Sequence, residues 1–507
     1  MRLAEAASRA YPLRVLENGG AEQNPEDWWR AMCGSTKQVL EKSGISPEKI
    51  SGISFCSQMQ GVVLVDREGR AVRPAMSYMD QRAERELKEG LKFGLQVAGY
   101  NASRLLKSVF ITNAVAASVK DPVWKYKWVE HNEPEAFSKI FKWLDVKEFL
   151  IQKCTGRFVM TTDSAFSTML YDMRPGKNCF SREMCSMFGV KMEHLPEIVR
   201  STDNVGGLTE CAAQSLGLLK GTPVFGGGGD ASLIGVGAGS VKEGSTHIYC
   251  GTSGWVSTVV PPKAVVDLNS MIASIVGADP RHYNYFAELD TAGKCLEWVK
   301  DHLALDEIDI YLEKKQVNDS YETVHTSLYD YMTHAVENVP PGSHGVFFTP
   351  WLHGNRCPFE DPHARGMFFN IGIETGKTDL IHSVLEGVCY HLRWMLEAQE
   401  KKIRVKDTVR FVGGGALSSL TCQILADILN RNVETVAHPQ NAGAVGAAIV
   451  VAVGLGVLDD LEKAAECIPV VRTYRPDPAS RAVYDNGFRI FRQLYYSNKS
   501  NFKSVNA

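Results

Sequence analysis

Three glycine-bearing turns, each directly after a short apolar strand, constrain the fold more than any other feature of the sequence. The first is VFGGGGDASL, in which four glycines, Gly226 to Gly229, lead to one carboxylate, Asp230. Glycine has no Cβ, so a glycine run suits a place where another group must approach the backbone closely. The other two turns are Gly251-Thr252-Ser253-Gly254 and Gly413-Gly414-Gly415. Strand, glycine turn and helix in succession are typical of α/β proteins.

The second and third turns have the chemistry of phosphate sites. The second lies between two β-rich runs, 246–250 and 255–260, so we expect a hairpin whose N–H groups and hydroxyls can hold phosphate oxygens. The third precedes a predicted helix over 417–430, whose N-terminus would attract an anion. A plain turn remains the alternative for each one taken alone, and the alternative for Asp230 is a helix N-cap.

Strand and helix signals alternate along most of the chain. An Asn24-Pro25-Glu26-Asp27 start signal predicts a helix through about Glu41. Further signals predict strands at 50–56, 61–66, 223–226 and 246–250, and a mainly helical region at 122–152. This alternation indicates an α/β fold.

Two stretches of the chain resemble each other weakly. TPVF at 222–225 and TVRFV at 408–412 are both followed by glycines and then by a helical pattern, with Asp230 opposite Ala416. A true internal repeat and a coincidence both remain open, because strand-glycine-helix turns are common.

A stretch that looks like a P-loop fails on spacing. GIETGKT at 372–378 has three residues between its glycines, whereas the phosphate-wrapping motif needs four. We expect an ordinary turn in which Thr378 caps a helix from Asp379 to about Glu397. A nucleotide site must therefore be built from other parts of the chain.

Composition directs the search toward small-molecule chemistry. The 507-residue chain is 44% hydrophobic and 22% charged, with a formal net charge of -3. It has no basic excess for nucleic acid or an anionic membrane. Its 12 cysteines contain no CxxC pair, which favours a reducing cytosol over a zinc site or disulfide framework. The uncharged stretch 441–458 is Gly/Ala-rich and barely of membrane length, so we expect a buried packing helix and a cytoplasmic protein.

Five segments taken together resemble the FGGY family of carbohydrate kinases, in its xylulokinase branch. They are GGGGDASLIGVGAG, YCGTSGW, GVFFTPWLHGNRCPFEDPHARGMFFNI, VLEGVCYHLRWMLE and VGGGALSSLTCQILADIL. PVWKYKW at 122–128 also resembles the first signature of that family. The agreement in order and spacing runs from about Tyr11 to Val457, which is most of the chain.

The resemblance implies a two-domain actin-like ATPase fold of the ribonuclease H-like kind, with a cleft between the domains. It implies a sugar-binding and catalytic domain over 1–240 and a nucleotide-binding domain over 241–507. ATP, Mg²⁺ and a sugar are the expected ligands, the metal ligands stay unassigned, and the family suggests a homodimer. The implied reaction is ATP-dependent phosphorylation of a ketopentose such as xylulose, or of a related sugar or polyol.

The resemblance also assigns roles to residues of the three turns. Asp230 is implied to be the general base that takes the proton of the sugar hydroxyl. The residues implied to contact the β- and γ-phosphates are Gly251, Thr252 and Ser253. Those implied to contact the α-phosphate and adenosine are Gly413, Gly414, Gly415 and Ala416. Gly293, in DTAGKCLEW, resembles another nucleotide-side glycine.

On the sugar side the sequence departs from the family in one position of a contact motif. Gln58, Met59 and Gln60 stand where xylulokinases usually have a Gln-Met-His-Gly run, so Gln60 replaces the histidine. An amide donates and accepts hydrogen bonds but cannot become cationic, which leaves the preferred sugar open. Asp80, in SYMDQR, resembles an active-site aspartate of the family, and the alternative is a surface pair with Arg82.

The start of the chain also differs from the family. Family members begin with a strand and a phosphate-binding turn of the form Asp-x-Gly-Thr, whereas the first residues here resemble the segment after that turn, about 20 residues later. One interpretation is a start codon downstream of the natural one. The other is a non-catalytic relative that binds sugar or nucleotide.

Overall fold

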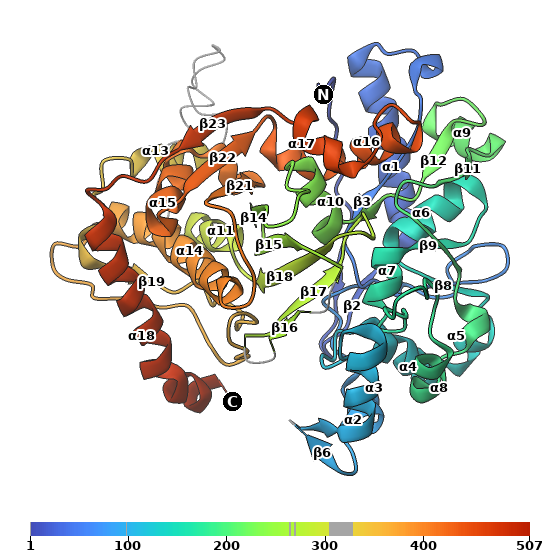
Figure 1. The fold of residues 1–507 in the computed structure, drawn as a ribbon, viewed down its shortest axis with the longest axis horizontal. Helices are drawn as coiled ribbons and strands as arrows, with labels where there is room; N and C mark the ends of the chain where they lie inside the picture. The colour runs from blue at the N-terminus through green and yellow to red at the C-terminus, as the bar shows by residue number, and fades with distance from the viewer. Residues whose placement is uncertain (1, 98, 263–264, 268–269, 304–327, 507) are drawn as a thin grey trace. The chain divides into compact units, whose positions relative to one another are not determined.

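The computed structural model describes residues 2–97, 99–262, 265–267, 270–303 and 328–506. The chain forms two compact units. Unit 1 consists of Met1–Gly237, Ile275–Tyr283 and Gly443–Ala464, and unit 2 consists of Ala238–Ser274, Asn284–Ala442 and Ala465–Ala507. Strands and helices alternate in both units, as Figure 1 shows, which confirms the predicted α/β class.

Unit 1 carries its strands in short pieces. They are β1 (Arg14–Val15), β2 (Ala21–Gln23), β3 (Cys56–Ser57), β4 (Val63–Val65), β5 (Ala75–Met76), β6 (Gln96–Val97), β7 (Tyr100–Asn101), β8 (Lys142–Leu144), β9 (Val159–Thr161), β10 (Glu197–Val199), β11 (Asn204–Gly207), β12 (Pro223–Phe225) and β13 (Gly228–Gly229). Two of the pairings are parallel, β9 with β10 and β3 with β13. The second of these joins the glycine run to a strand about 170 residues earlier in the chain.

The helices of unit 1 cover these strands. They are α1 (Pro25–Ser43), α2 (Glu84–Leu91), α3 (Ala102–Thr112), α4 (Pro122–Asn132), α5 (Pro134–Ser138), α6 (Val146–Thr155), α7 (Thr162–Ser167), α8 (Arg182–Phe188), α9 (Glu210–Leu216), α10 (Asp230–Gly237) and α16 (Ala442–Gly454). A buried cluster that includes Phe55, Ile151, Val159, Leu208 and Val224 joins the strands to α6. Burial of such side chains supplies the main favourable free energy for this unit.

Unit 2 is built on one long mixed sheet. Its strand order is β16-β17-β18-β15-β14-β21-β22-β23. The strands are β14 (Thr246–Cys250), β15 (Gly254–Val260), β16 (Val266–Asp267), β17 (Ile272–Val276), β18 (Tyr283–Leu289), β21 (Thr408–Val412), β22 (Asn432–Val436) and β23 (Val470–Tyr474). Strand β14 pairs antiparallel with β15 and parallel with β21, so Cys250 and Val412 end at the same edge.

The remaining elements of unit 2 pack on this sheet. They are β19 (Phe347–Phe348), β20 (Phe368–Phe369), α11 (Gly293–His302), α13 (Leu328–Ala335), α14 (Lys377–Glu400), α15 (Ser419–Leu429), α17 (Ala464–Cys467) and α18 (Arg481–Asn506). Helix α15 contacts β22 and β23, and α14 packs against α15 and α18. The C-terminal helix α18 belongs to unit 2.

Several predicted elements are confirmed. Asn24 caps α1, with the Glu26 N–H donating to its side chain at 3.1 Å. The predicted strand at 246–250 and the hairpin after it are present. The stretch 441–458 contains α16, whose Gly446 allows close packing because a Cβ there would lie 2.2 Å from the Leu233 carbonyl oxygen. Among the described residues, no helix is long and apolar enough to cross a bilayer.

The region 122–152 is mainly helical, as predicted, and is interrupted by β8, which pairs with β4 and buries Trp143. Two predictions of local structure are wrong. In 50–56 only Ile53 forms an isolated bridge and only Cys56 belongs to a strand. Helix α14 is capped by Gly376 with the Asp379 side chain accepting from the Gly376 N–H at 2.9 Å, so Thr378 is not the cap.

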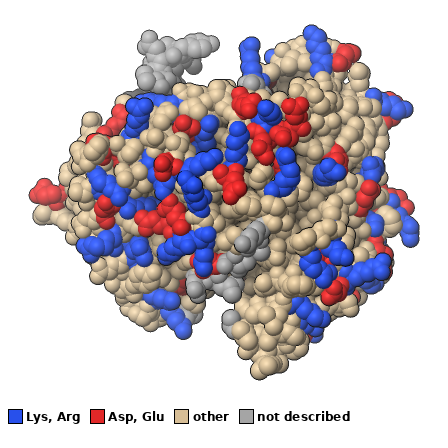
Figure 2. Space-filling model, in the orientation of Figure 1, with Lys and Arg blue, Asp and Glu red and all other residues tan. Residues whose placement is uncertain are grey.

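The charged side chains of both signs are interspersed on the face that Figure 2 shows. This distribution accords with the formal net charge of -3. Exposed pairs of this kind contribute little to stability, so the fold depends on the buried contacts described above.

Candidate active site

The glycine run of unit 1 is shaped by contact with the chain itself. Gly227 has a φ of +69°, and a Cβ there would lie 2.3 Å from the Phe55 carbonyl oxygen. A Cβ at Gly226 would lie 2.6 Å from the Arg200 carbonyl oxygen. The groups that approach these two glycines are therefore backbone atoms of the chain itself.

The pairing of β13 with β3 brings predicted site residues together. Gly228 lies opposite Cys56 and Gly229 opposite Ser57 in a parallel register. Parallel strands end at the same edge, so Asp230, which follows β13, emerges where Gln58 and Met59 follow β3. Met59 contacts this turn directly, because a Cβ on Gly229 would lie 2.2 Å from the Met59 Cγ and Sδ atoms.

Asp230 is half-buried at the first residue of α10. One carboxylate oxygen accepts a hydrogen bond from the Ala231 N–H at 2.8 Å. A negative charge is stabilised at this end of a helix. Burial, and then the charges of Asp230 and Asp163, raise the pKa of the Cys56 thiol. Asp230 and Asp163 thus both lie close enough to Cys56 to affect its thiol. The N-terminus of α10 favours a negative charge on Asp230, as a proton acceptor requires.

Asp163, on α7, anchors the residue before Asp230 and was not found from the sequence. Its Oδ2 accepts from the Gly229 N–H at 2.7 Å, and its Oδ1 accepts from the Ser164 N–H at 2.9 Å and from the Thr161 hydroxyl. Burial alone would raise the pKa of Asp163, but Lys147 and these hydrogen bonds hold it below its usual range. A weak signal was present, since Asp163 stands two residues after β9, whereas Asp230 directly follows β13.

A buried cation lies beside Asp163. The Lys147 Nζ donates to Glu148 and to Ser164, and lies 3.9 Å from the Asp163 Oδ1. The Lys147, Glu148 and Asp163 side chains are fully buried. Buried charges of this kind persist only when they are paired and hydrogen-bonded, so this cluster fixes the chain beneath the Gly229–Asp230 turn.

The residues predicted to contact a sugar follow β3 in a clamped turn. The Gln58 Nε2 donates to the Gln23 Oε1 at 2.7 Å. Gln60 has a φ of +63°, in the left-handed region. The N–H groups of Gln60 and Gly61 both donate to the carboxylate of Asp145, at 3.0 and 2.9 Å. Burial, and then the charge of Glu148, raise the pKa of Asp145 to about 7.

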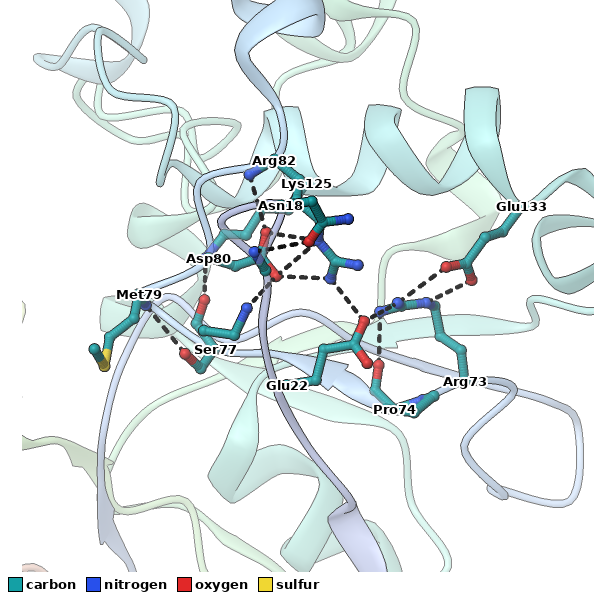
Figure 3. A network of polar contacts seen from close by, with 12 residues as sticks. Asn18, Glu22, Arg73, Pro74, Ser77, Met79, Asp80, Arg82, Lys125 and Glu133 are labelled. Atoms are coloured by element: carbon teal, nitrogen blue, oxygen red, sulfur yellow. Dashed lines mark hydrogen bonds and ion pairs between the residues drawn. The ribbon is translucent and has the colours of Figure 1, made fainter. Parts of the chain in front are cut away.

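Asp80 lies in a polar network beneath this turn. Figure 3 shows its carboxylate among Arg82, Ser77 and Lys125. Its Oδ2 accepts from the Ala21 N–H at 2.9 Å and from the Arg82 guanidinium at 2.7 Å. Asp80 is fully buried, so the alternative of a surface pair with Arg82 is wrong. Its oxygens hold the chain at 77–82 to β2, which makes Asp80 a support of the site in this structure.

In unit 2 the second turn and Gly293 lie together. The Gly251 N–H donates to the Ser253 carbonyl at 2.9 Å and closes the hairpin. The Gly293 N–H, at the start of α11, donates to the Gly251 carbonyl at 2.7 Å. A Cβ on Gly293 would lie 2.4 Å from that oxygen, so the contact requires glycine. Thr252 is exposed, and its carbonyl accepts from the Lys294 N–H at 3.1 Å.

The third turn lies at the same edge of the sheet. Gly413 has a φ of +93°, and a Cβ there would lie 2.5 Å from the Cys250 carbonyl oxygen. A Cβ on Gly415 would lie 2.9 Å from the Cys250 side chain, whereas one on Gly414 would meet nothing within 4 Å. Ala416 is buried. Unit 2 therefore gathers all of the predicted nucleotide residues around the end of β14, with space above Gly414.

The arrangement at this edge suits an anionic ligand. The carboxyl ends of β14 and β21 lie side by side, and ligands of α/β sheets bind outside such ends. The N-terminus of α15, capped by Ser418, follows the third turn and adds a favourable dipole for phosphate. Among the described residues, no three or more His, Cys, Asp or Glu side chains are grouped so that they could hold a metal ion by themselves.

Comparisons with known proteins agree in both units. Residues 2–237 match the N-terminal domain, and residues 247–455 the C-terminal domain, of the FGGY family of carbohydrate kinases. The chain is 27% identical over 500 residues to the xylulose kinase of Bacillus subtilis (strain 168), covering 98% of this chain and 93% of the relative. It is 26% identical over 497 residues to the gluconokinase of the same strain, covering 97% and 91%.

Among solved structures, a ligand-bound xylulose kinase from Lactobacillus acidophilus is similar with a TM-score of 0.82. The identity is 22%, and the match covers 98% of this chain and 94% of that chain. At this level of identity the likeness shows the fold, which is the two-domain actin-like ATPase fold that the sequence resemblance implied.

Proposed function

The chain belongs to the FGGY family of carbohydrate kinases and is a sugar kinase, and from this premise we propose that it phosphorylates a ketopentose such as xylulose, or a related sugar or polyol, with ATP. The similar proteins named xylulose kinase and gluconokinase support this substrate class. We propose Asp230 as the general base, Gln58, Met59 and Gln60 as sugar contacts, and Asp80 as part of the sugar side.

One observation carries the assignment of Asp230. The parallel pairing of β3 with β13 ends both strands at one edge, so a carboxylate and the predicted sugar-contact turn emerge together. Asp163 fixes the backbone just before Asp230 through the Gly229 N–H at 2.7 Å. A general base must be held within reach of the proton that it abstracts, and this anchoring supplies the required rigidity.

The chemistry proposed for Asp230 balances without further groups. The carboxylate accepts the proton of the sugar hydroxyl as the hydroxyl oxygen attacks the γ-phosphorus of ATP. The bond from the γ-phosphorus to the bridging oxygen breaks, and ADP leaves with that electron pair. The products are the sugar phosphate, ADP and one proton on Asp230, which passes to solvent before the next turnover.

The glycine turns of unit 2 are proposed to bind the nucleotide. Gly251, Thr252 and Ser253 would contact the β- and γ-phosphates through N–H groups and hydroxyls. The α-phosphate and adenosine would contact residues that lie on the other side of Cys250, namely Gly413, Gly414, Gly415 and Ala416, with Gly293 supporting the hairpin. We propose accordingly that 1–240 supplies the sugar side and 241–507 the nucleotide side.

The carboxylates of the site fit Mg²⁺ as the metal that accompanies ATP. Mg²⁺ usually keeps several waters and takes one or two carboxylates together with substrate phosphates, so it needs no protein cage. Asp230 is the half-buried carboxylate that would lie beside the metal and the γ-phosphate, and because it is proposed as the base, the protein ligands of the metal stay unassigned. When bound, Mg²⁺ supplies positive charge that stabilises the transferring phosphoryl group.

A substrate panel tests the proposed function. ADP release is measured with the purified chain, ATP and Mg²⁺ against ketopentoses, aldoses, polyols and gluconate, and the phosphorylated product is identified by mass. We expect the highest kcat/KM with a ketopentose. Background ADP release with every sugar, together with a thermal shift on adding sugar or nucleotide, would instead support a binding protein without turnover.

A further inference from the structure

A buried lysine on α4 links the two predicted sugar-side segments of unit 1. The Lys125 Nζ donates to the Gln60 carbonyl at 2.7 Å and to the Ser77 carbonyl at 2.9 Å. These carbonyls lie 65 and 48 residues away in the chain. Lys125 is fully buried, so its ammonium depends on hydrogen bonds within the protein, and these two carbonyls accept from it. The lysine therefore adds a side-chain link between two segments that already pair through the antiparallel Val62–Met76 bridge.

The Gln60 peptide is held from both sides. Lys125 binds its carbonyl, and the Asp145 carboxylate accepts from its N–H at 3.0 Å. Gln60 has a φ of +63°, a conformation that non-glycine residues adopt at a cost. Such a conformation persists only where surrounding groups impose it, and such positions cluster at functional sites. The hydrogen bonds at both ends of the Gln60 peptide impose it here.

The second segment is held by the network that Figure 3 shows. The Met79 N–H donates to the Ser77 hydroxyl at 3.1 Å, and the Asp80 N–H donates to the Ser77 carbonyl at 3.2 Å. The same Ser77 carbonyl accepts from Lys125. Lys125 thus links the Gln60 turn to Ser77, the first residue of the Ser77–Asp80 turn. A shift of either turn would break a charge-assisted hydrogen bond inside the protein.

We propose that Lys125 is a positioning residue for sugar binding, which holds the Gln60 turn and the Ser77–Asp80 turn in one fixed arrangement. The proposal rests on the proposed function, because that function makes these turns the sugar side. Lys125 does not touch the reacting atoms and acts through the Gln60 backbone. Its loss therefore weakens sugar binding without removing the base or the nucleotide turns.

The charge on Lys125 makes this tether sensitive to pH. The charged groups that act on it are Asp80, Asp145 and Asp121, which favour its cationic form, and Lys120, which opposes it. Burial outweighs the carboxylates and lowers the pKa of Lys125 to about 8. The ammonium is thus charged at neutral pH and loses its charge in mildly alkaline solution, where its hydrogen bonds weaken.

The test compares Lys125→Met with Lys127→Met, a matched control on the same helix whose side chain contacts Glu130 and the Gly189 carbonyl. We expect Lys125→Met to raise the sugar KM by about tenfold or more, a loss of the size seen for charge-assisted hydrogen bonds. The ATP KM and kcat should stay within about twofold, and Lys127→Met should change neither KM.

A double-mutant cycle separates positioning from general destabilisation. If Lys125 acts through Gln60, the effects of Lys125→Met and Gln60→Ala on the sugar KM will not add, because the second change removes what the first one misplaces. The sugar KM of the wild type should rise between pH 7 and 9.5 while the ATP KM stays flat. This profile also decides the matter if Lys125→Met does not fold.

Each outcome has a separate meaning. Additive effects, an unchanged sugar KM in folded Lys125→Met, or a pH-independent sugar KM in the wild type would overturn the positioning role while leaving the kinase intact. Absence of turnover in the wild type with every sugar would overturn the proposed function, and with it the premise of this inference.

Discussion

Met59 lies directly over Gly229, and a Cβ on Gly229 would come within 2.2 Å of the Met59 Cγ and Sδ atoms. This contact joins the turn predicted to bind sugar to the residue that precedes the proposed base. The atoms involved belong to the middle of the Met59 side chain, so an added methyl group cannot be accommodated by moving a flexible end alone. The close approach of the two turns therefore depends on glycine at this position.

Gly229→Ala should lower kcat/KM by about tenfold or more, because the new methyl group separates the two turns and displaces Asp230. Gly372→Ala is the matched control, since a Cβ there meets nothing within 4 Å. The measurement is steady-state kinetics of both variants, with circular dichroism to confirm folding. Equal activity of a folded Gly229→Ala protein and the control would show that the Met59 contact does not set the geometry.

Gly414→Ala tests whether Gly414 is needed for nucleotide binding or for packing of the protein. No protein atom lies within 4 Å of a Cβ at Gly414, so we expect an unchanged Tm. If the nucleotide lies against this glycine, the ATP KM should rise about fivefold or more, roughly 1 kcal/mol of lost binding. Gly413→Ala, strained by a φ of +93°, should instead lower the Tm. An unchanged ATP KM in Gly414→Ala would place the nucleotide elsewhere.

Gln60→His tests the position at which the sugar-contact turn departs from the Gln-Met-His-Gly run of xylulokinases. Histidine can become cationic near pH 6.5 and glutamine cannot, so the variant should acquire a sugar KM that changes between pH 5.5 and 7.5. We expect the ranking of sugars to change by about tenfold for at least one pair, with the ATP KM unchanged. The measurement is kcat/KM across the sugar panel at several pH values. A variant with the wild-type ranking and pH profile would remove Gln60 from the sugar contacts.

Glu386, buried on α14, makes the stability of unit 2 depend on pH. Burial raises the pKa of Glu386 from 4.5 to about 7, although the Gly342 N–H donates to it at 2.7 Å and the Ser343 hydroxyl at 2.8 Å. A carboxyl whose folded pKa is raised binds more protons in the folded state, so its stabilising effect is complete below about pH 4.5 and is lost as pH rises through 7.

Glu386→Gln should therefore lose less stability than the wild type between pH 5 and pH 8. The expected difference in the free energy of unfolding is about 2 kcal/mol over that interval. Urea denaturation at the two pH values measures it, and Glu374→Gln, a change at an exposed acid on the same surface turn as Gly372, is the control. Parallel pH dependence of wild type and Glu386→Gln would contradict the raised pKa.

The sequence was sufficient to predict local features that depend on one residue type at one position. The glycine runs predicted close approach to the backbone, which Gly227 and Gly413 show, and Asn24 caps its helix through a local hydrogen bond, so each feature is visible in a short window. The hairpin at 251–254 follows from two β-rich runs around a short turn. The assignment of roles to these residues came from the family resemblance, because their chemistry alone leaves a plain turn as an alternative.

The parts that the sequence did not predict depend on contacts between distant segments. Strands β3 and β13 have two residues each, Cys-Ser and Gly-Gly, and such pieces carry no periodicity. Asp163 and Lys125 act on residues 66 and 65 positions away, so only the folded topology reveals them. The strand β8 was missed because pairing with β4 overrides the helical pattern around it.

The most direct test of the central claim is the turnover of Asp230→Asn against Asp460→Asn. Both side chains lie at the start of a short helix, and asparagine retains a hydrogen-bond acceptor in each, so both variants should fold. We predict that Asp230→Asn lowers kcat by about a hundredfold or more, the size expected for loss of a general base, with the ATP KM nearly unchanged. Asp460→Asn should keep wild-type turnover. Wild-type kcat in Asp230→Asn would contradict the assignment of this residue as the base.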